Sequence, residues 1–151
     1  MTALIVTACA GFLLAVLWMD LIFDTQVRDR GAGPDEAALE SISAYYRRAT
    51  TTSRPMSALI ALVMAILLVT LTVEAVCGNR PGWLMALSAA LAGGPILLAL
   101  ARTVPNAVRL GQPTGLPEQR HRLAQRVLRD HVICLIGILT LLVLWLTPGL
   151  G

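Results

Sequence analysis

Four long runs of apolar residues without a charge limit what this chain can fold into. They cover residues 3–19, 56–73, 81–101 and 132–151. A hydrocarbon core about 30 Å thick needs roughly 20 helical residues to cross it. None of the runs alternates polar and apolar residues as a membrane barrel strand does, and backbone in lipid must satisfy its own hydrogen bonds. The sequence therefore predicts an all-α membrane protein.

The predicted architecture is a four-transmembrane-helix bundle that occupies residues 1–151 as one transmembrane domain. Charged residues make up 14% of the chain, against roughly 25% in soluble domains. This excludes a soluble globular domain and a disordered chain. The first run is too long for a signal peptide and follows no basic residue, so we expect it to be retained. The expected spans are 3–23, 56–76, 81–103 and 128–147, with an amphipathic interfacial helix over 34–49.

Arginine predicts the orientation of the spans. The chain has no lysine, and eleven of its twelve arginines lie between spans one and two or around the loop between spans three and four. Only Arg80 lies on the other side. Short loops rich in Arg stay in the cytoplasm. We expect a multi-pass protein of the plasma (inner) membrane with both loops cytoplasmic and both termini outside. The net charge of +3 then suits anionic lipid of the bilayer and indicates no nucleic-acid partner.

The first loop has the pattern of an amphipathic helix that begins near Pro34. Such a helix lies in the membrane interface with its tyrosines at headgroup depth. Its opposite side should face water. The expected apolar stripe is Ala38, Leu39, Ile42, Tyr45, Tyr46 and Ala49, and the expected polar side is Glu36, Glu40, Ser43 and Arg47.

Span three carries small residues at intervals of four, namely Ala86, Ala90 and Gly94. Small residues at this spacing let helix backbones approach closely. The Gly94–Pro95 step should also bend the helix, either for packing alone or as a hinge beside a binding site. Span one carries a second small stripe: Thr7, Gly11 and Ala15.

Tryptophans lie near the expected ends of the spans. Trp18, Trp83 and Trp145 are each interpreted as an anchor at the membrane interface. Spans two and three are joined by a short turn, which makes them antiparallel neighbours. Across this turn, Glu74 is expected to pair with Arg80.

Polar residues gather at the expected inner ends of the spans. In an antiparallel bundle these ends reach one membrane depth, so the side chains can converge. Ionisable residues within spans are often functional, although charges at span ends also pair with nearby arginines to hold loops in place. The predicted ligand-binding residues are Asp24, Tyr46, Arg102, Asn106, Arg109 and Asp130, and the predicted catalytic pair is His131 with Asp20.

His131 continues the apolar side of a helix that should begin at Pro117 and run unbroken into span four. It should therefore face the bundle interior, where histidine is more often a hydrogen-bonded packing residue than a catalyst. If it meets Asp20 or Asp24, the group could move a proton. No recognised ligand spacing connects these residues, so the sequence predicts no metal and no cofactor.

Three segments carry a resemblance to known proteins. Residues 18–24 (WMDLIFD), 45–48 (YYRR) and 104–110 (VPNAVRL) resemble those of small uncharacterised bacterial four-span membrane proteins. The Pro105–Asn106 pair followed by Arg109 is also similar to the anthrone-oxygenase-like membrane family. That resemblance implies oxidation of lipophilic polycyclic substrates. No catalytic set matches residue by residue, so none is carried over.

Three functions remain open from the sequence. The leading hypothesis is a protein that binds a lipophilic small molecule or lipid in a polar pocket on the cytoplasmic side. The second is a membrane enzyme that uses His131 and Asp20 for proton transfer on a lipophilic substrate. The third is an accessory or assembly subunit, in a homo-oligomer or a larger membrane complex, that packs through the small-residue stripes.

Overall fold

The computed structural model describes residues 1–27, 35–49, 54–112 and 115–147. Within these ranges all regular structure is helical, which confirms the predicted all-α class. Four stretches are long and apolar enough to cross a membrane. Three of them correspond to α1 (Thr2–Asp24), α3 (Arg54–Cys77) and α6 (Pro117–Leu146), and the fourth is the continuous run Gly82–Leu110.

Shorter elements complete the described chain. The 3₁₀ turn η1 (Thr25–Val27) extends α1, and α2 (Glu36–Arg47) lies in the first loop. The fourth apolar stretch divides into α4 (Gly82–Leu98), the π-helical turn η3 (Ala99–Thr103) and α5 (Val104–Leu110). It is longer than the predicted span 81–103 and continues past Pro105 in the first turn of α5, although proline has no N–H to donate.

The last helix agrees with the prediction that it begins at Pro117 and continues into span four without a break, for 30 residues in all. The interfacial helix predicted over 34–49 corresponds to α2, with Asp35 as its N-cap. The Asp35 carboxylate accepts hydrogen bonds from the backbone N–H groups of Ala37 and Ala38. Pro34, where the prediction placed the start, lies outside the described residues.

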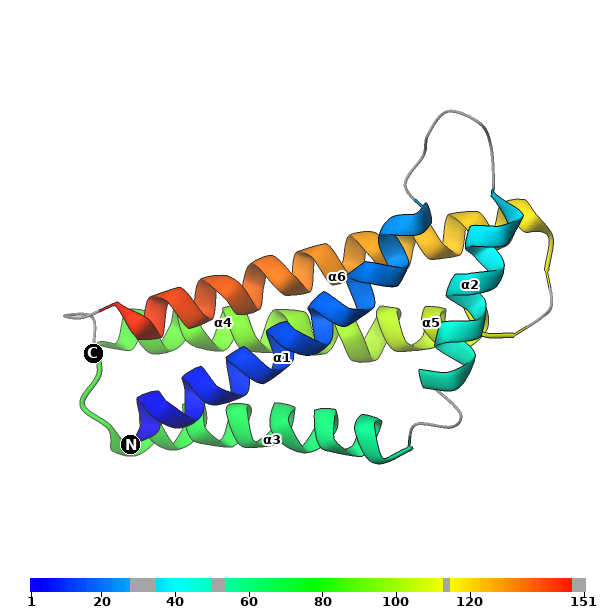
Figure 1. Ribbon diagram of the computed structural model, residues 1–151. Helices are drawn as coiled ribbons and strands as arrows, with labels where there is room; N and C mark the ends of the chain where they lie inside the picture. The colour runs from blue at the N-terminus through cyan, green and yellow to red at the C-terminus, as the bar shows by residue number, and fades with distance from the viewer. Residues whose placement is uncertain (28–34, 50–53, 113–114, 148–151) are drawn as a thin grey trace.

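The long helices lie along one axis, and α1 crosses them obliquely (Figure 1). Helix α1 starts beside α3 and reaches α6 at its far end, and α4 packs between α3 and α6. Helix α2 lies across the end opposite the N-terminus, where it contacts α5 and α6. Because α1 moves away from α3 along its length, these two helices separate toward the α2 end.

The apolar side of α2 packs on the protein itself. Leu39 and Ile42 are buried against Leu110 of α5 and Val127 of α6. The prediction that Ser43 faces water is wrong, because this side chain is also buried. Its hydroxyl oxygen accepts a hydrogen bond from Arg120 Nη2 at 2.7 Å, which satisfies the polar group inside the contact between α2 and α6.

At the opposite end of the bundle, the prediction for one tryptophan is wrong. Trp145 was expected at the membrane interface, but it is buried and its indole N–H donates to Ser88 Oγ at 2.9 Å. The Arg80 guanidinium lies over its ring, 4.3 Å from the centroid. Arg80 also pairs with Glu74 at 3.3 Å, as predicted. A buried partner for its N–H explains why this Trp leaves the surface, whereas Trp18 and Trp83 are exposed.

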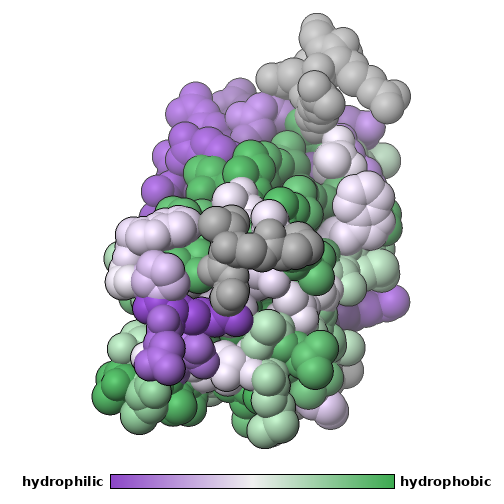
Figure 2. Space-filling model, turned by 90° about the vertical axis from the view of Figure 1, so that its left-hand side faces the viewer, coloured by the Kyte–Doolittle hydropathy of each residue, from purple (hydrophilic) through white to green (hydrophobic). Residues whose placement is uncertain are grey.

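The small stripe on α4 does not mediate the close contact that was expected of it. Ala86, Ala90 and Gly94 are exposed, and a Cβ atom added to Gly94 would meet no atom within 4 Å. At the end of the bundle that carries the two chain termini, the space-filling view shows hydrophobic side chains over much of that face, with hydrophilic ones gathered in patches (Figure 2). The stripe is thus available to lipid or to another chain.

The close contact lies instead between α4 and α6, at Gly137. A Cβ atom at this position would lie 2.8 Å from Cγ of Pro95 and 3.4 Å from the carbonyl oxygen of Leu91. Pro95 cannot donate to that carbonyl, because proline has no N–H. A rigid proline ring therefore fills the space where a side chain of α6 would otherwise lie.

Replacing Gly137 by alanine should destabilise the protein by about 1–3 kcal/mol, because the added methyl group overlaps the Pro95 ring. Gly11→Ala is the matched control, since its Cβ atom would meet nothing within 4 Å, and helix propensity favours alanine over glycine by about 1 kcal/mol. Unfolding midpoints in one detergent give the comparison. Equal midpoints for the two variants would contradict the close contact.

Candidate functional site

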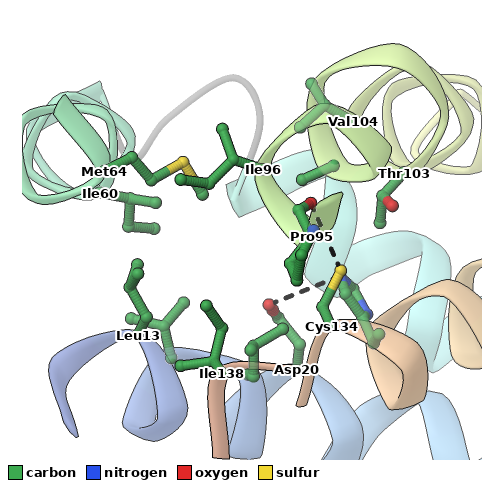
Figure 3. A pocket seen from close by; sticks show the side chains of 14 residues that line it. Leu13, Asp20, Ile60, Met64, Pro95, Ile96, Thr103, Val104, Cys134 and Ile138 are labelled. Atoms are coloured by element: carbon green, nitrogen blue, oxygen red, sulfur yellow. Dashed lines mark hydrogen bonds and ion pairs between the residues drawn. The ribbon is translucent and has the colours of Figure 1, made fainter. Parts of the chain in front are cut away.

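A largely apolar cavity of about 150 Å³ lies between α1, α3, α4 and α6 (Figure 3). Leu13 and Ile138 form one side, and Ile60 and Met64 of α3 lie across from them. Asp20 extends into the same space. The other residues of the lining are Val16, Leu17, Pro95, Ile96, Ala99, Thr103, Val104, His131 and Cys134.

A larger cavity of about 590 Å³ adjoins the first toward α2. It adds Tyr45, Tyr46 and Arg48 from the first loop, and Met56 and Ser57 from the start of α3. The two cavities together form what we call the cleft, which follows the separation of α1 from α3. Both linings contain Val16, Asp20, Ile60, Thr103, Val104 and His131.

One imidazole at the wall of the cleft lies between two carboxylates. His131 Nδ1 is 2.6 Å from Asp24 Oδ2, which is a hydrogen bond. On the other side of the ring, Nε2 is 3.8 Å from Asp20 Oδ2, which is too long for one. Asp24 is only 1% exposed and stands behind the histidine, whereas Asp20 lines both cavities.

Two adjacent tyrosines complete this arrangement, one for each carboxylate. Tyr45 Oη donates to Asp20 Oδ1, and Tyr46 Oη donates to Asp24 Oδ1, both at 2.6 Å. Short bonds of this kind to a carboxylate are stronger than bonds between neutral groups. We refer to Asp20, Asp24, Tyr45, Tyr46 and His131 as the His–Asp–Tyr cluster.

The local sequence explains how three helices build the cluster. Asp20 and Asp24 are four residues apart, so they project from one side of the last turns of α1. The tyrosines are consecutive on α2, and Phe23 stacks on Tyr45 with ring centroids 4.0 Å apart. This stacking fixes Tyr45 over the end of α1. His131 supplies the only contribution from α6 to the cluster as defined.

The two phenols are held in their protonated form. Burial raises the pKa of Tyr45, and the hydrogen bond and negative charge of Asp20 raise it further. Burial also raises the pKa of Tyr46, and the charge of Asp24 adds to this effect. Both hydroxyls therefore remain hydrogen-bond donors through the physiological pH range.

Asp130 neighbours the cluster but lines neither cavity. It is 0% exposed, and its carboxylate lies 3.5 Å from Arg102 Nη2 and 4.0 Å from Arg129 Nε. Arg102 belongs to the π-helical turn η3. The sequence offered pairing with nearby arginines as the alternative for Asp20 and Asp24; among the described aspartates it is Asp130 that makes such pairs.

The remaining predicted site residues divide between the cleft and the surface. His131, Asp20 and Tyr46 line the cleft, and Asp24 supports His131 from behind. Asn106 is half-buried and Arg109 is exposed, and neither belongs to the lining of the two cavities.

The site predicted from sequence omitted Tyr45, Arg48, Thr103 and the apolar residues of α3. Tyr45 and Arg48 had a signal, because both belong to the YYRR segment that carries the predicted ligand-binding Tyr46. The side that Thr103 presents depends on the π-helical turn, which nothing in the sequence pattern indicated.

No group of three or more His, Cys, Asp or Glu residues in the described part of the chain is arranged to hold a metal ion. No protein-family model, curated protein or solved structure matches this sequence. The candidate site therefore rests on its own geometry.

Alkaline titration should report the cluster directly, because Tyr45 and Tyr46 are the only tyrosines in the chain. In the folded protein, phenolate absorbance should appear well above the ordinary pKa of 10.0. The raised pKa values stabilise the fold below pH 10, and this contribution is lost as pH rises further. Normal titration of both phenols in folded protein would contradict the cluster.

Tyr46→Phe should lower the free energy of unfolding by about 1.5–3 kcal/mol at neutral pH, the range for a hydrogen bond to a charged group. Tyr45→Phe should lower the free energy of unfolding by less, because the Asp20 side chain is more exposed than that of Asp24. Denaturation midpoints of the two variants and the wild type test this order. A larger loss from Tyr45→Phe would oppose it.

Proposed function

We propose that this chain is a multi-pass protein of the plasma (inner) membrane whose α2 end lies in the cytoplasm. The arginine-bearing loops meet at that end, and both chain termini then lie outside. Exposed apolar side chains along α3, including Leu62, Val69 and Val76, suit contact with lipid. Helix α2 then lies at the cytoplasmic surface with its apolar side on the bundle.

In this setting, we propose that the protein binds a lipophilic small molecule or a lipid in the cleft. The observation that carries the proposal is a pocket with mainly apolar walls and two titratable side chains, Asp20 and His131, where its two cavities adjoin. Ligand sites are concave, mostly apolar and contain a few placed polar groups, with typical volumes of about 300–1,000 Å³. The larger cavity, at about 590 Å³, falls in this range.

The position of the cleft suits a ligand that arrives through the bilayer. The exposed part of the cleft, near the α2 end, includes Met56 and Ser57 at the start of α3, and both residues are exposed. Its inner part is lined by Leu13, Ile60 and Ile138, which suit hydrocarbon. A polar head can then stay near Asp20 at the cytoplasmic level while an apolar tail lies between α1 and α3.

A second candidate function is proton transfer on a lipophilic substrate, and the Asp24–His131 hydrogen bond favours it. A buried carboxylate on one ring nitrogen fixes the orientation and tautomer of an imidazole, which leaves the other nitrogen to act as acid or base. Here Nδ1 meets Asp24 and Nε2 is directed toward Asp20 at the cleft.

The accessory-subunit alternative rests on the exposed stripe of Ala86, Ala90 and Gly94. Such a stripe suits close packing with a helix of another chain. Measuring the oligomeric state of the protein in mild detergent tests this alternative. A monomer without a co-purifying partner would remove the support for this alternative.

Ile60→Trp should remove most co-purified ligand, because residue 60 lines both cavities and the larger side chain fills them. Leu62→Trp is the control, since residue 62 lies on the same helix, is 56% exposed and lines neither cavity. Mass spectrometry of extracted protein compares the two variants. Unchanged ligand in Ile60→Trp would refute binding in the cleft.

For the enzyme candidate, any turnover found in an extract screen should fall by about 10²–10⁴-fold in His131→Gln, the range for general acid–base catalysis. Asp24→Asn should also lower the rate, while Glu40→Gln on the exposed side of α2 should not. An activity that survives the His131 substitution would assign the chemistry elsewhere.

A further inference from the structure

The larger cavity contains two opposite charges besides His131. The Asp20 carboxylate lies on the α1 side and the Arg48 guanidinium follows the end of α2. The rest of its lining is mainly apolar or aromatic. A ligand that fills this cavity therefore meets a carboxylate and a guanidinium group at once, next to the smaller apolar cavity.

The Asp20 carboxylate has acceptor capacity that faces the cleft. Tyr45 donates to Oδ1, whereas the His131 ring nitrogen Nε2 lies 3.8 Å from Oδ2, too far for a hydrogen bond. The side chain is 19% exposed. An ionised carboxylate has room for several hydrogen bonds. A primary ammonium group can donate to Oδ2, whereas a quaternary ammonium group has no N–H to donate.

Arg48 offers the complementary group. It is exposed, and within the described chain it makes no ion pair with an Asp or Glu. Arginine presents five N–H donors in a planar fork that matches phosphate oxygens. An anion of this kind on Arg48 and an ammonium group on Asp20 would occupy one cavity.

We propose that the ligand is a zwitterionic aminophospholipid of the phosphatidylethanolamine type. Its ammonium group binds Asp20, its phosphate binds Arg48, and one acyl chain enters the apolar cavity beside Ile60. This inference rests on the proposed binding function and adds the headgroup. A lipid with an anionic glycerol headgroup lacks the cation for Asp20, and a choline headgroup lacks the N–H.

The test uses the full chain in detergent with three lipids of identical acyl chains and ethanolamine, choline or glycerol headgroups. Native mass spectrometry measures which lipid is retained in competition. We expect the wild type to retain the ethanolamine lipid at least about fivefold more than either other lipid, which corresponds to about 1 kcal/mol. Equal retention of the three lipids would overturn the assignment without any variant.

Two substitutions separate the two contacts. Asp20→Asn should abolish the preference for ethanolamine over choline, with Glu40→Gln as the matched control on the exposed side of α2. Arg48→Gln should weaken retention of both zwitterionic lipids about tenfold, the effect of losing one charge-assisted contact. Arg122→Gln, which removes an exposed arginine outside the cleft, should not.

The outcomes distinguish this inference from the binding function itself. If Ile60→Trp removes bound lipid but Asp20→Asn leaves the headgroup preference intact, the cleft binds lipid and the headgroup assignment is wrong. If Ile60→Trp changes nothing, the binding function fails as well. Glycerophosphoethanolamine, which has no acyl chains, should not displace the lipid at equal concentration. Displacement would overturn the assignment to a lipid.

Discussion

The His131 imidazole between two aspartates is the interaction on which this end of the molecule depends. A buried charge is costly unless it is paired and hydrogen-bonded. Asp24 meets this requirement with His131 on one oxygen and Tyr46 on the other. Since these groups come from α1, α2 and α6, satisfying one carboxylate fixes the relative positions of three helices. The protein therefore places a polar group inside an apolar bundle without leaving it unpaired.

The cleft follows from the same contact between Asp24 and His131. Helix α1 must reach α6 for Asp24 to meet His131, and so it moves away from α3 toward the α2 end (Figure 1). Apolar side chains from both helices line the resulting space, and Asp20 lies where its two cavities adjoin. The same crossing that satisfies the buried carboxylate thus creates room for a ligand. The path of α1 therefore accounts for both the Asp24–His131 contact and the cleft.

The sequence predicted the features that arise within a single helix. Long uncharged runs located the helices, spacing placed Asp20 and Asp24 on one side of α1, and an apolar stripe directed His131 inward. Features that depend on a contact between helices were missed or wrong. Ser43 is buried because Arg120 reaches it from α6, and Trp145 leaves the surface because Ser88 accepts its N–H. Hydropathy describes a residue's average preference and contains no information about which partner another helix will bring.

The π-helical turn η3 adds one residue to a helical turn between α4 and α5. If the same residues rewound as ordinary α-helix, the extra residue would no longer be accommodated and all of α5 would rotate by about 100° around its axis. Ala107 and Leu110, which now pack beneath α2, would swing off that contact. The wider winding of this turn, as much as the side chains of α5, therefore keeps α2 and its two tyrosines in place over the end of α1.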